Sequence, residues 1–287
     1  MRFVLLWILC LLIVTMPCPL VAEEIHLGET SLTIPAPEGF ALLTKDIQPL
    51  YDLAQRTVSS ENVQFAMFIP AEELPSAREH QLTSLPRRAS VQSAKAIIQH
   101  TVTNAEFDSL KESIKSLNDA TMKQLNAELP KEIEKLNKDV LDTYHRKLGY
   151  SVAGIVPLPA HRNEERCLAY SMAMKGQINN AAGAAVPFEN VATVSALHVR
   201  GKVLFLWVYA EKEGLQWSRE LARHWSDAVL EANPSTGEIA ALERGSWLSR
   251  LSNSLSPRDL MYLALASVIA LIGILWRRAV RLRRRAL

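Results

Sequence analysis

The sequence predicts an α+β fold: an antiparallel sheet with helices packed on one face, a helical insertion and a C-terminal transmembrane helix. Three observations predict this fold. Short strand-like runs occur before and after the middle of the chain, residues 104–147 have helical periodicity, and an uncharged apolar run lies near the C-terminus. Strands grouped apart from helices favour an antiparallel sheet with segregated helices over a parallel one.

The N-terminus has the features of a secretory signal peptide. Arg2 precedes an apolar run, and Ala22 stands before a polar stretch, so we expect residues 1–22 to be removed after Ala22. An uncleaved anchor is the alternative. Lipidation at Cys18 is disfavoured because Pro17 before it is not a small residue.

Residues 259–276 are predicted to form a single transmembrane helix. The stretch 260–276 carries no charge, and six arginines follow it in the tail 277–287. Such a run spans a bilayer, and dense arginine marks the cytoplasmic side. A buried core helix and an interfacial helix are the alternatives. The predicted location is the bacterial inner membrane, with the N-terminal domain in the periplasm and the tail in the cytoplasm. The residues expected to anchor the helix at the lipid interface are Trp276, Arg277 and Arg278.

The charge and the cysteine content of the exported part limit the functions and the cross-links that can be expected of it. Residues 23–256 hold 29 acidic and 24 basic side chains, a formal charge of −5. This gives no electrostatic reason to expect nucleic-acid binding. Cys167 is the one cysteine left after signal removal, so an internal disulfide is excluded. A buried inert thiol and an intermolecular disulfide are the two interpretations of Cys167.

The exported domain is expected over residues 23–234, and its elements follow in order. The first part is expected to form a hairpin with a glycine turn over 25–34, which ends at the proline-rich stretch 35–40. A short helix over 43–56 and two strands, at 64–69 and 88–99, are expected next. A loop is expected over 149–165.

The helical insertion begins with a capping box at Thr103 and Glu106. An apolar stripe continues beyond the first turns, and Pro130 removes a backbone donor, so we expect two helical segments within about 104–147. The stripe of the first segment consists of Phe107, Leu110, Ile114 and Leu117.

The last part of the domain gives the clearest strand pattern. Three strands are expected at 168–177, 191–199 and 202–210, with a tight turn at Arg200 and Gly201. A helix at 215–232 ends before Pro234, and a juxtamembrane linker occupies 235–258.

The early hairpin, the IPAPEGF stretch at 34–40 and the strand–turn–strand–helix of 191–232 resemble the PsbP-type α/β sandwich. That fold is known from an extrinsic photosystem subunit and from a Ran-binding import factor. The resemblance covers about half of the exported domain. It implies a protein-docking module, and it transfers no functional residues.

No catalytic, metal or cofactor site is predicted. The seven histidines have no metalloprotease spacing, and there is no nucleophile elbow or phosphate-binding loop. The best ligand cluster, HRNEERC at 161–167, is interpreted as a solvated loop leading into a strand. The adjacent carboxylates of this chain point apart on strands and helices, so they are poor acid–base couples.

Two functional hypotheses follow. The leading one is a non-enzymatic, membrane-tethered interaction or scaffold domain. The stripe Phe107, Leu110, Ile114 and Leu117 is its candidate face for a homodimer or another envelope protein, although packing on the sheet or on the other helical segment is the alternative. The second hypothesis is a small-ligand-binding or hydrolytic domain with a site lined by Tyr170, Trp207 and Tyr209.

Overall fold

The structure is a computed structural model. It describes residues 22–48, 50–56, 58, 61–79, 87–116, 126–127, 130–131, 133–134, 137–138, 141, 150–179 and 184–234. Residues 1–21 of the predicted signal peptide 1–22 lie outside the described residues, as do the linker from 235, the predicted transmembrane helix 259–276 and the arginine tail. Among the helices that are described, none combines the length and the apolar character needed to cross a bilayer.

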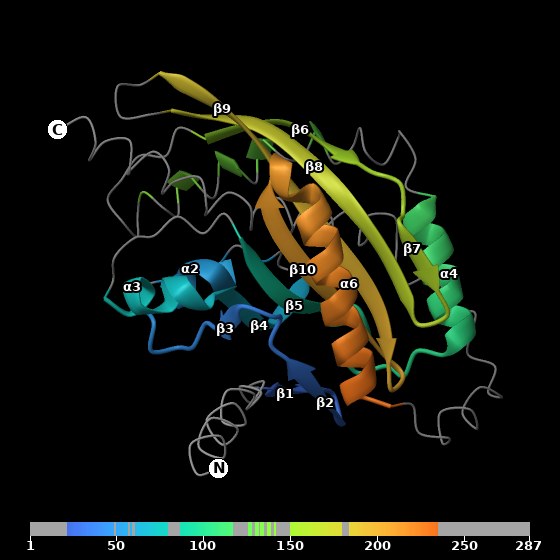
Figure 1. Ribbon diagram of the computed structural model, residues 1–287. Coiled ribbons are helices and arrows are strands. Elements are labelled where there is room, and N and C mark those ends of the chain that lie inside the picture. Colours follow the sequence, from blue (N-terminus) through green and yellow to red (C-terminus); the bar gives the residue numbers. More distant parts are fainter. Residues whose placement is uncertain are drawn as a thin grey trace, which may run out of the picture.

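A mixed α+β fold is confirmed, built on an antiparallel sheet (Figure 1). In the described part of the chain the strand order is β3-β4-β5-β10-β9-β8-β6, and β7 also pairs with β8. The strands of this sheet are β3 (Phe40–Leu42), β4 (Asn62–Pro70), β5 (Arg88–Ala94), β6 (Tyr150–Pro157), β7 (Arg162–Glu164), β8 (Cys167–Asn179), β9 (Ala185–Val199) and β10 (Lys202–Glu211).

The predicted N-terminal hairpin is confirmed as a separate two-stranded sheet. β1 (Ala22–Leu27) pairs with β2 (Thr30–Pro35), and Gly28 adopts a φ of 60° in the turn between them. Glycine has no Cβ and adopts this left-handed conformation at little cost.

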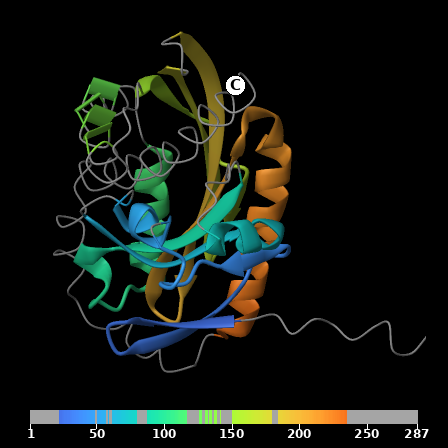
Figure 2. The same ribbon diagram turned by 90° about the vertical axis from the view of Figure 1, so that its left-hand side faces the viewer.

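Helices cover both faces of the sheet, which corrects the prediction that they pack on one face. We call inner the face that carries Trp207, and outer the face that carries Leu206. Helix α6 (Leu215–Ala232) and the N-terminal hairpin pack on the outer face. The short helices α2 (Leu50–Arg56) and α3 (Leu74–Arg78), together with α4 (Asn104–Lys115), pack on the inner face. Figure 2 shows α6 (orange) and α4 (green) on opposite sides of the sheet.

Helix α6 has the bounds that its sequence pattern predicts. Ala222, Trp225 and Val229 recur at helical spacing, and all three are buried against the outer face. The strand beneath fits this contact because β8 alternates large and small side chains. Its small outer side chains, such as Ala169 and Ser171, let α6 approach closely, whereas its large ones fill the inner core.

The region expected to be a loop over 149–165 contains two strands, and this expectation was wrong. β6 and β7 both pair with β8. β6 contains Gly154 and ends at Pro157, so its local pattern is weak, and it depends on its long neighbour for hydrogen bonds. The strand expected over 88–99 is also shorter than predicted. It ends at Ala94, and a short 3-10 helix, η2 (Lys95–Ile97), follows it.

The helical insertion begins as predicted. The Thr103 hydroxyl accepts from the Glu106 amide at 3.3 Å, and the Glu106 carboxylate accepts from the Thr103 amide at 2.8 Å. This capping box starts α4, which ends at Lys115. Helical residues recur between 126 and 141, and the rest of the predicted insertion lies outside the described residues.

Candidate functional site

The stripe predicted as a partner face belongs to the core. Phe107, Leu110 and Ile114 are 0%, 6% and 6% exposed, and they pack on the inner face of the sheet. The Phe107 ring also stacks on His198, with centroids 5.3 Å apart. Because the sheet already buries this stripe, it is not a free docking face, and the alternative of packing on the sheet is the correct one. Leu117 lies outside the described residues.

The three aromatic residues predicted to line a ligand site do share one surface. Tyr170, Trp207 and Tyr209 all belong to the core of the inner face, and none is more than 8% exposed. The rings of Trp207 and Tyr209 stack with centroids 6.2 Å apart. Burial raises the pKa of both tyrosine hydroxyls, that of Tyr209 to about 12, so both stay protonated at neutral pH.

A row of buried polar side chains lies beside these aromatics, and the sequence pattern does not single it out as buried. We call it the inner polar stripe: Asn62, Arg88, Ser90 and Gln92. Arg88 pairs with Tyr209 across the strands, and Ser90 pairs with Trp207. The strand sequence RASVQSA contains the signal, because polar residues occupy alternate positions. A strand with one face in water shows the same alternation, so the pattern alone does not reveal that both faces of β5 are covered.

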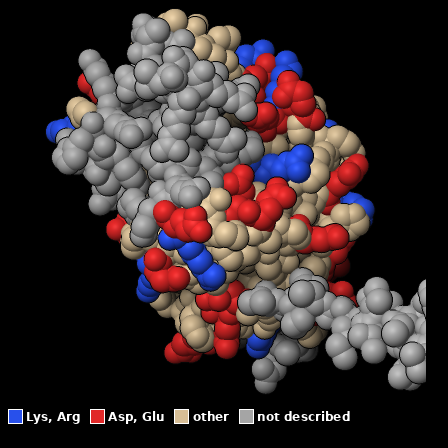
Figure 3. All heavy atoms as spheres, turned by 60° about the vertical axis from the view of Figure 1, so that its left-hand side comes forward, with Lys and Arg blue, Asp and Glu red and all other residues tan. Residues whose placement is uncertain are grey.

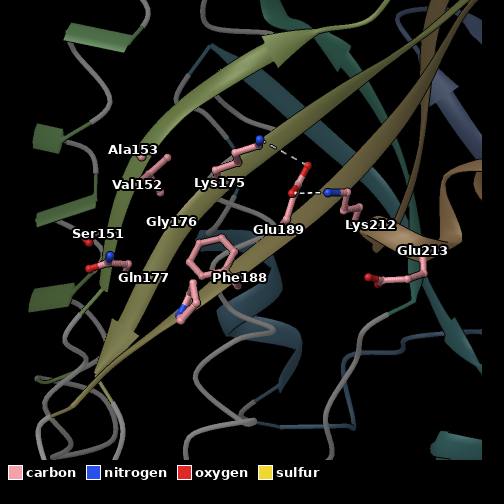
Figure 4. A pocket seen from close by; sticks show the side chains of 11 residues that line it. Ser151, Val152, Ala153, Lys175, Gly176, Gln177, Phe188, Glu189, Lys212 and Glu213 are labelled. Carbon is pink, nitrogen blue, oxygen red and sulfur yellow. Dashed lines mark hydrogen bonds and ion pairs between the residues drawn. The ribbon is translucent and has the colours of Figure 1, made fainter.

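An open groove lies where the β8–β9 hairpin extends past the start of α6 (Figure 4). We call it the hairpin groove, and its volume is about 660 Å³. Its lining residues come from β6, β8, β9 and the 3-10 turn η3 (Lys212–Gly214) before α6. They are Ser151, Val152, Ala153, Lys175, Gly176, Gln177, Pro187, Phe188, Glu189, Lys212 and Glu213.

Charges of both signs line this groove and bind one another. Lys212 Nζ lies 2.8 Å from one carboxylate oxygen of Glu189, and Lys175 Nζ lies 3.9 Å from the other. Both lysine side chains extend toward Glu189 (Figure 4). The hydrogen bond from Lys212 lowers the pKa of Glu189, and the same bond raises the pKa of Lys212. Glu189 and Lys212 are therefore held in their charged forms, and the two ion pairs orient the three side chains.

Gly176 leaves the space that the ring of Phe188 occupies in the groove. A Cβ built on Gly176 would lie 2.4 Å from the ring of Phe188 and 2.4 Å from the carbonyl oxygen of Ser151. Neither contact is possible for a real side chain, so β6 and Phe188 can approach β8 only at a glycine. Phe188 itself is 7% exposed and belongs to the inner core.

The groups that could carry chemistry near residues 161–167 are engaged in structural contacts. Cys167 is fully buried, and burial raises the pKa of its thiol to about 11. Arg162 binds Glu164 at 2.7 Å and Asp227 of α6 at 2.6 Å. Within the described ranges no group of three or more His, Cys, Asp or Glu side chains is placed to hold a metal ion. Trp276, Arg277 and Arg278 lie outside those ranges.

Comparisons with known proteins find a weak similarity in fold and no family for this chain. No protein-family model and no curated protein sequence matches it. Among solved structures it has weak similarity to the solution structure of cyanobacterial PsbP (CyanoP) from Synechocystis sp. PCC 6803. The identity is 13% and the TM-score 0.25, and the match covers 77% of this chain and 96% of the other. The resemblance to the PsbP-like fold suggested by the sequence is thus found again, in weak form.

Proposed function

We propose that this chain is a membrane-anchored periplasmic domain that binds another protein and has no catalytic role. The anchor rests on the uncharged run 260–276 and the six arginines after it. The export of the domain rests on the signal-like N-terminus. In this arrangement the domain of residues 23–234 stands outside the cytoplasm and the tail 277–287 remains inside.

The anchor and the topology are tested together on the full chain. We expect the protein to stay with the membrane pellet in alkaline carbonate, and a phosphatase reporter fused after residue 287 to be inactive. A variant with the six tail arginines replaced by glutamine is the matched control, and its reporter should gain activity. Release by carbonate, or an active reporter on the unaltered tail, would refute the anchor.

The hairpin groove is the observation that supports protein binding. It is open, it is built on three strands, and its charges are held in place by ion pairs. Surfaces that bind proteins combine such a polar rim with a small apolar centre, whereas sites for small molecules enclose most of the ligand. Acidic side chains are spread over the face in Figure 3, with basic ones among them, so a partner must match local charges rather than one large field.

Site-specific photo-crosslinking in intact membranes tests this role. A photoreactive amino acid at Gln177, an exposed groove residue, should give one discrete adduct of higher mass. The same group at Glu220, exposed on α6, is the control and should give none. Glu189→Gln removes both ion pairs and should weaken the Gln177 adduct. Identical adducts from both positions, or none from Gln177, would contradict docking at the groove.

A further inference from the structure

The hairpin groove presents two ammonium groups around one recessed carboxylate. The side chain of Glu189 is 23% exposed, whereas those of Lys175 and Lys212 are 60% and 57% exposed. The two lysines come from different elements, β8 and η3, and both extend toward Glu189 (Figure 4). A partner that enters the groove therefore meets the ammonium groups before it meets the carboxylate.

The charges of these three side chains do not cancel. Lys212 Nζ lies 2.8 Å from one oxygen of Glu189, but Lys175 Nζ lies 3.9 Å from the other, which is too far for a hydrogen bond. Two ammonium groups beside one carboxylate leave a positive charge in excess. Each ammonium has three N–H donors, so both lysines keep donors for a further acceptor.

Glu213, which also lines the groove, offsets this excess only weakly. Its side chain lies apart from the Lys212–Glu189 pair (Figure 4). Of the groups that act on the pKa of Lys212, Glu213 raises it the least, whereas the hydrogen bond to Glu189 raises it the most. The positive charge therefore belongs to the side of the groove where the two lysines lie.

The rest of the domain confines an acidic partner to this place. Residues 23–256 have a formal charge of −5, and acidic side chains are spread over the face in Figure 3. A negatively charged segment is repelled by such a surface and attracted where two lysines outnumber one carboxylate. Repulsion elsewhere adds to selectivity as much as attraction at the site does.

We propose that the protein segment seated in the hairpin groove carries an Asp or Glu side chain whose carboxylate bridges Lys175 and Lys212. This carboxylate accepts one hydrogen bond on each oxygen and forms a ring of alternating charges with Glu189 on the far side. Glu189 orients the lysines, so it contributes to the site although its charge has the same sign as that of the bound group. Ala153 and Pro187, both exposed in the lining, contact the neighbouring residues of the segment. The inference rests on docking at the groove and specifies the chemistry of the docked segment.

Photo-crosslinking of the full chain in isolated membranes tests this chemistry. The photoreactive amino acid replaces Gln177, which shares a strand face with Lys175. A double variant, Lys175→Gln with Lys212→Gln, should reduce the adduct about fivefold, because each exposed ion pair contributes modestly to binding. The double variant with arginine at both positions keeps the charges and should retain the adduct. Lys95→Gln, at an exposed lysine outside the groove, is the control and should change nothing.

The adduct also reveals which group is bound. Mass spectrometry of the peptide joined to position 177 should find an Asp or Glu close to the point of attachment. Replacing that residue by lysine in the partner should abolish the adduct. Combining this change with Lys175→Glu and Lys212→Glu should restore it in part, and a misfolded variant would not show such a rescue.

The outcomes separate this inference from docking itself. An adduct of equal strength in the unaltered chain and in the double glutamine variant would leave docking intact and overturn the recognition of an acid. A cross-linked peptide without Asp or Glu, or an equal loss in Lys95→Gln, would overturn it as well. No adduct from Gln177 in any variant would overturn both docking and its chemistry.

Discussion

The indole N–H of Trp225, on α6, donates a 2.8 Å hydrogen bond to the backbone carbonyl of Pro35, at the end of β2. The Trp225 ring also meets Phe68 of the sheet edge to face, with centroids 5.6 Å apart. One buried side chain thus joins three parts of the fold: the N-terminal hairpin, the closing helix and the sheet. The N-terminal hairpin and the closing helix, which lie near opposite ends of the described chain, meet at this contact.

Replacing this indole should weaken the whole domain. Trp225→Phe leaves the Pro35 carbonyl without its donor and reduces the buried volume, so we expect a loss of about 2–3 kcal/mol in the free energy of unfolding. Urea titration followed by circular dichroism measures it. Trp217→Phe is the control, because Trp217 lies on a more exposed part of α6, with the guanidinium carbon of Arg87 4.4 Å from its ring centroid. This variant should lose less than about 1 kcal/mol of unfolding free energy. Similar losses in both variants would contradict the special role of Trp225.

A second prediction concerns Gly176 in the hairpin groove. Gly176→Ala forces a methyl group against the Ser151 carbonyl and the Phe188 ring, so we expect a loss of about 2 kcal/mol in unfolding free energy. Gly154→Ala is the matched control, because the heavy atoms nearest to its Cβ would belong to the side chain of Asn126, the closest at 3.4 Å. That variant should stay within about 0.5 kcal/mol of the parent. A tolerated Gly176→Ala would show that β6 moves aside freely.

The same elements show which parts of the fold the sequence could predict. The bounds of α6 and the cap of α4 depend on local spacing and on side chains three residues apart, so the sequence alone was sufficient. β6 was missed because an edge strand with Gly154 and Pro157 obtains its hydrogen bonds from β8, which lies later in the chain. An amphipathic stripe also cannot say which face of a sheet it will cover, so α4 was placed with α6 rather than opposite it.

The candidate sites show the same limit more strongly. Trp207 and Tyr209 lie on one face because alternate residues of a strand share a face, and this much follows from the sequence. Arg88 was missed because an arginine at an alternate position normally marks the solvent side. Only the packing of helices on the inner face shows that this side chain is 3% exposed. The hairpin groove depends on how far β8 and β9 extend beyond α6, which no local pattern encodes.

A third prediction concerns the thiol of Cys167. Its pKa is about 11 in the fold against 9.0 for an unperturbed thiol, so thiolate at neutral pH is roughly a hundredfold rarer. We expect iodoacetamide to modify Cys167 at least about a hundredfold more slowly in the folded chain than in urea, as measured on its own peptide by mass spectrometry. Because the folded pKa is the higher one, the thiol stabilises the fold below pH 9, and this contribution is lost as pH rises toward 11.

Non-reducing electrophoresis of the full chain adds a check on Cys167. A fully buried thiol should form no disulfide-linked dimer, so Cys167→Ala should leave the band pattern unchanged. Rapid modification in the folded state, or a dimer that disappears in Cys167→Ala, would show that the thiol is accessible and would restore the intermolecular disulfide.

The last prediction concerns His198, a buried histidine on β9. Burial lowers its pKa, while the hydrogen bond at 2.7 Å to the Val102 carbonyl opposes that shift. Arg166 lowers the pKa further, and Asp108 and Glu106 raise it. Because the folded pKa lies below the unfolded value of 6.5, the unfolded chain binds the proton first. Stability should therefore be full above pH 6.5 and fall as pH drops through the folded pKa.

Unfolding free energies measured from about pH 7.5 to 5 test this histidine, and one proton limits its contribution to about 1.4 kcal/mol per pH unit. His198→Gln does not titrate and should show a shallower decline than the parent. His224→Gln, at an exposed position of α6, is the control and should follow the parent curve. If unfolding free energy falls with pH at the same slope in all three proteins, other groups set the acid sensitivity. Protonation of His198 would then not affect the contact between β9 and α4.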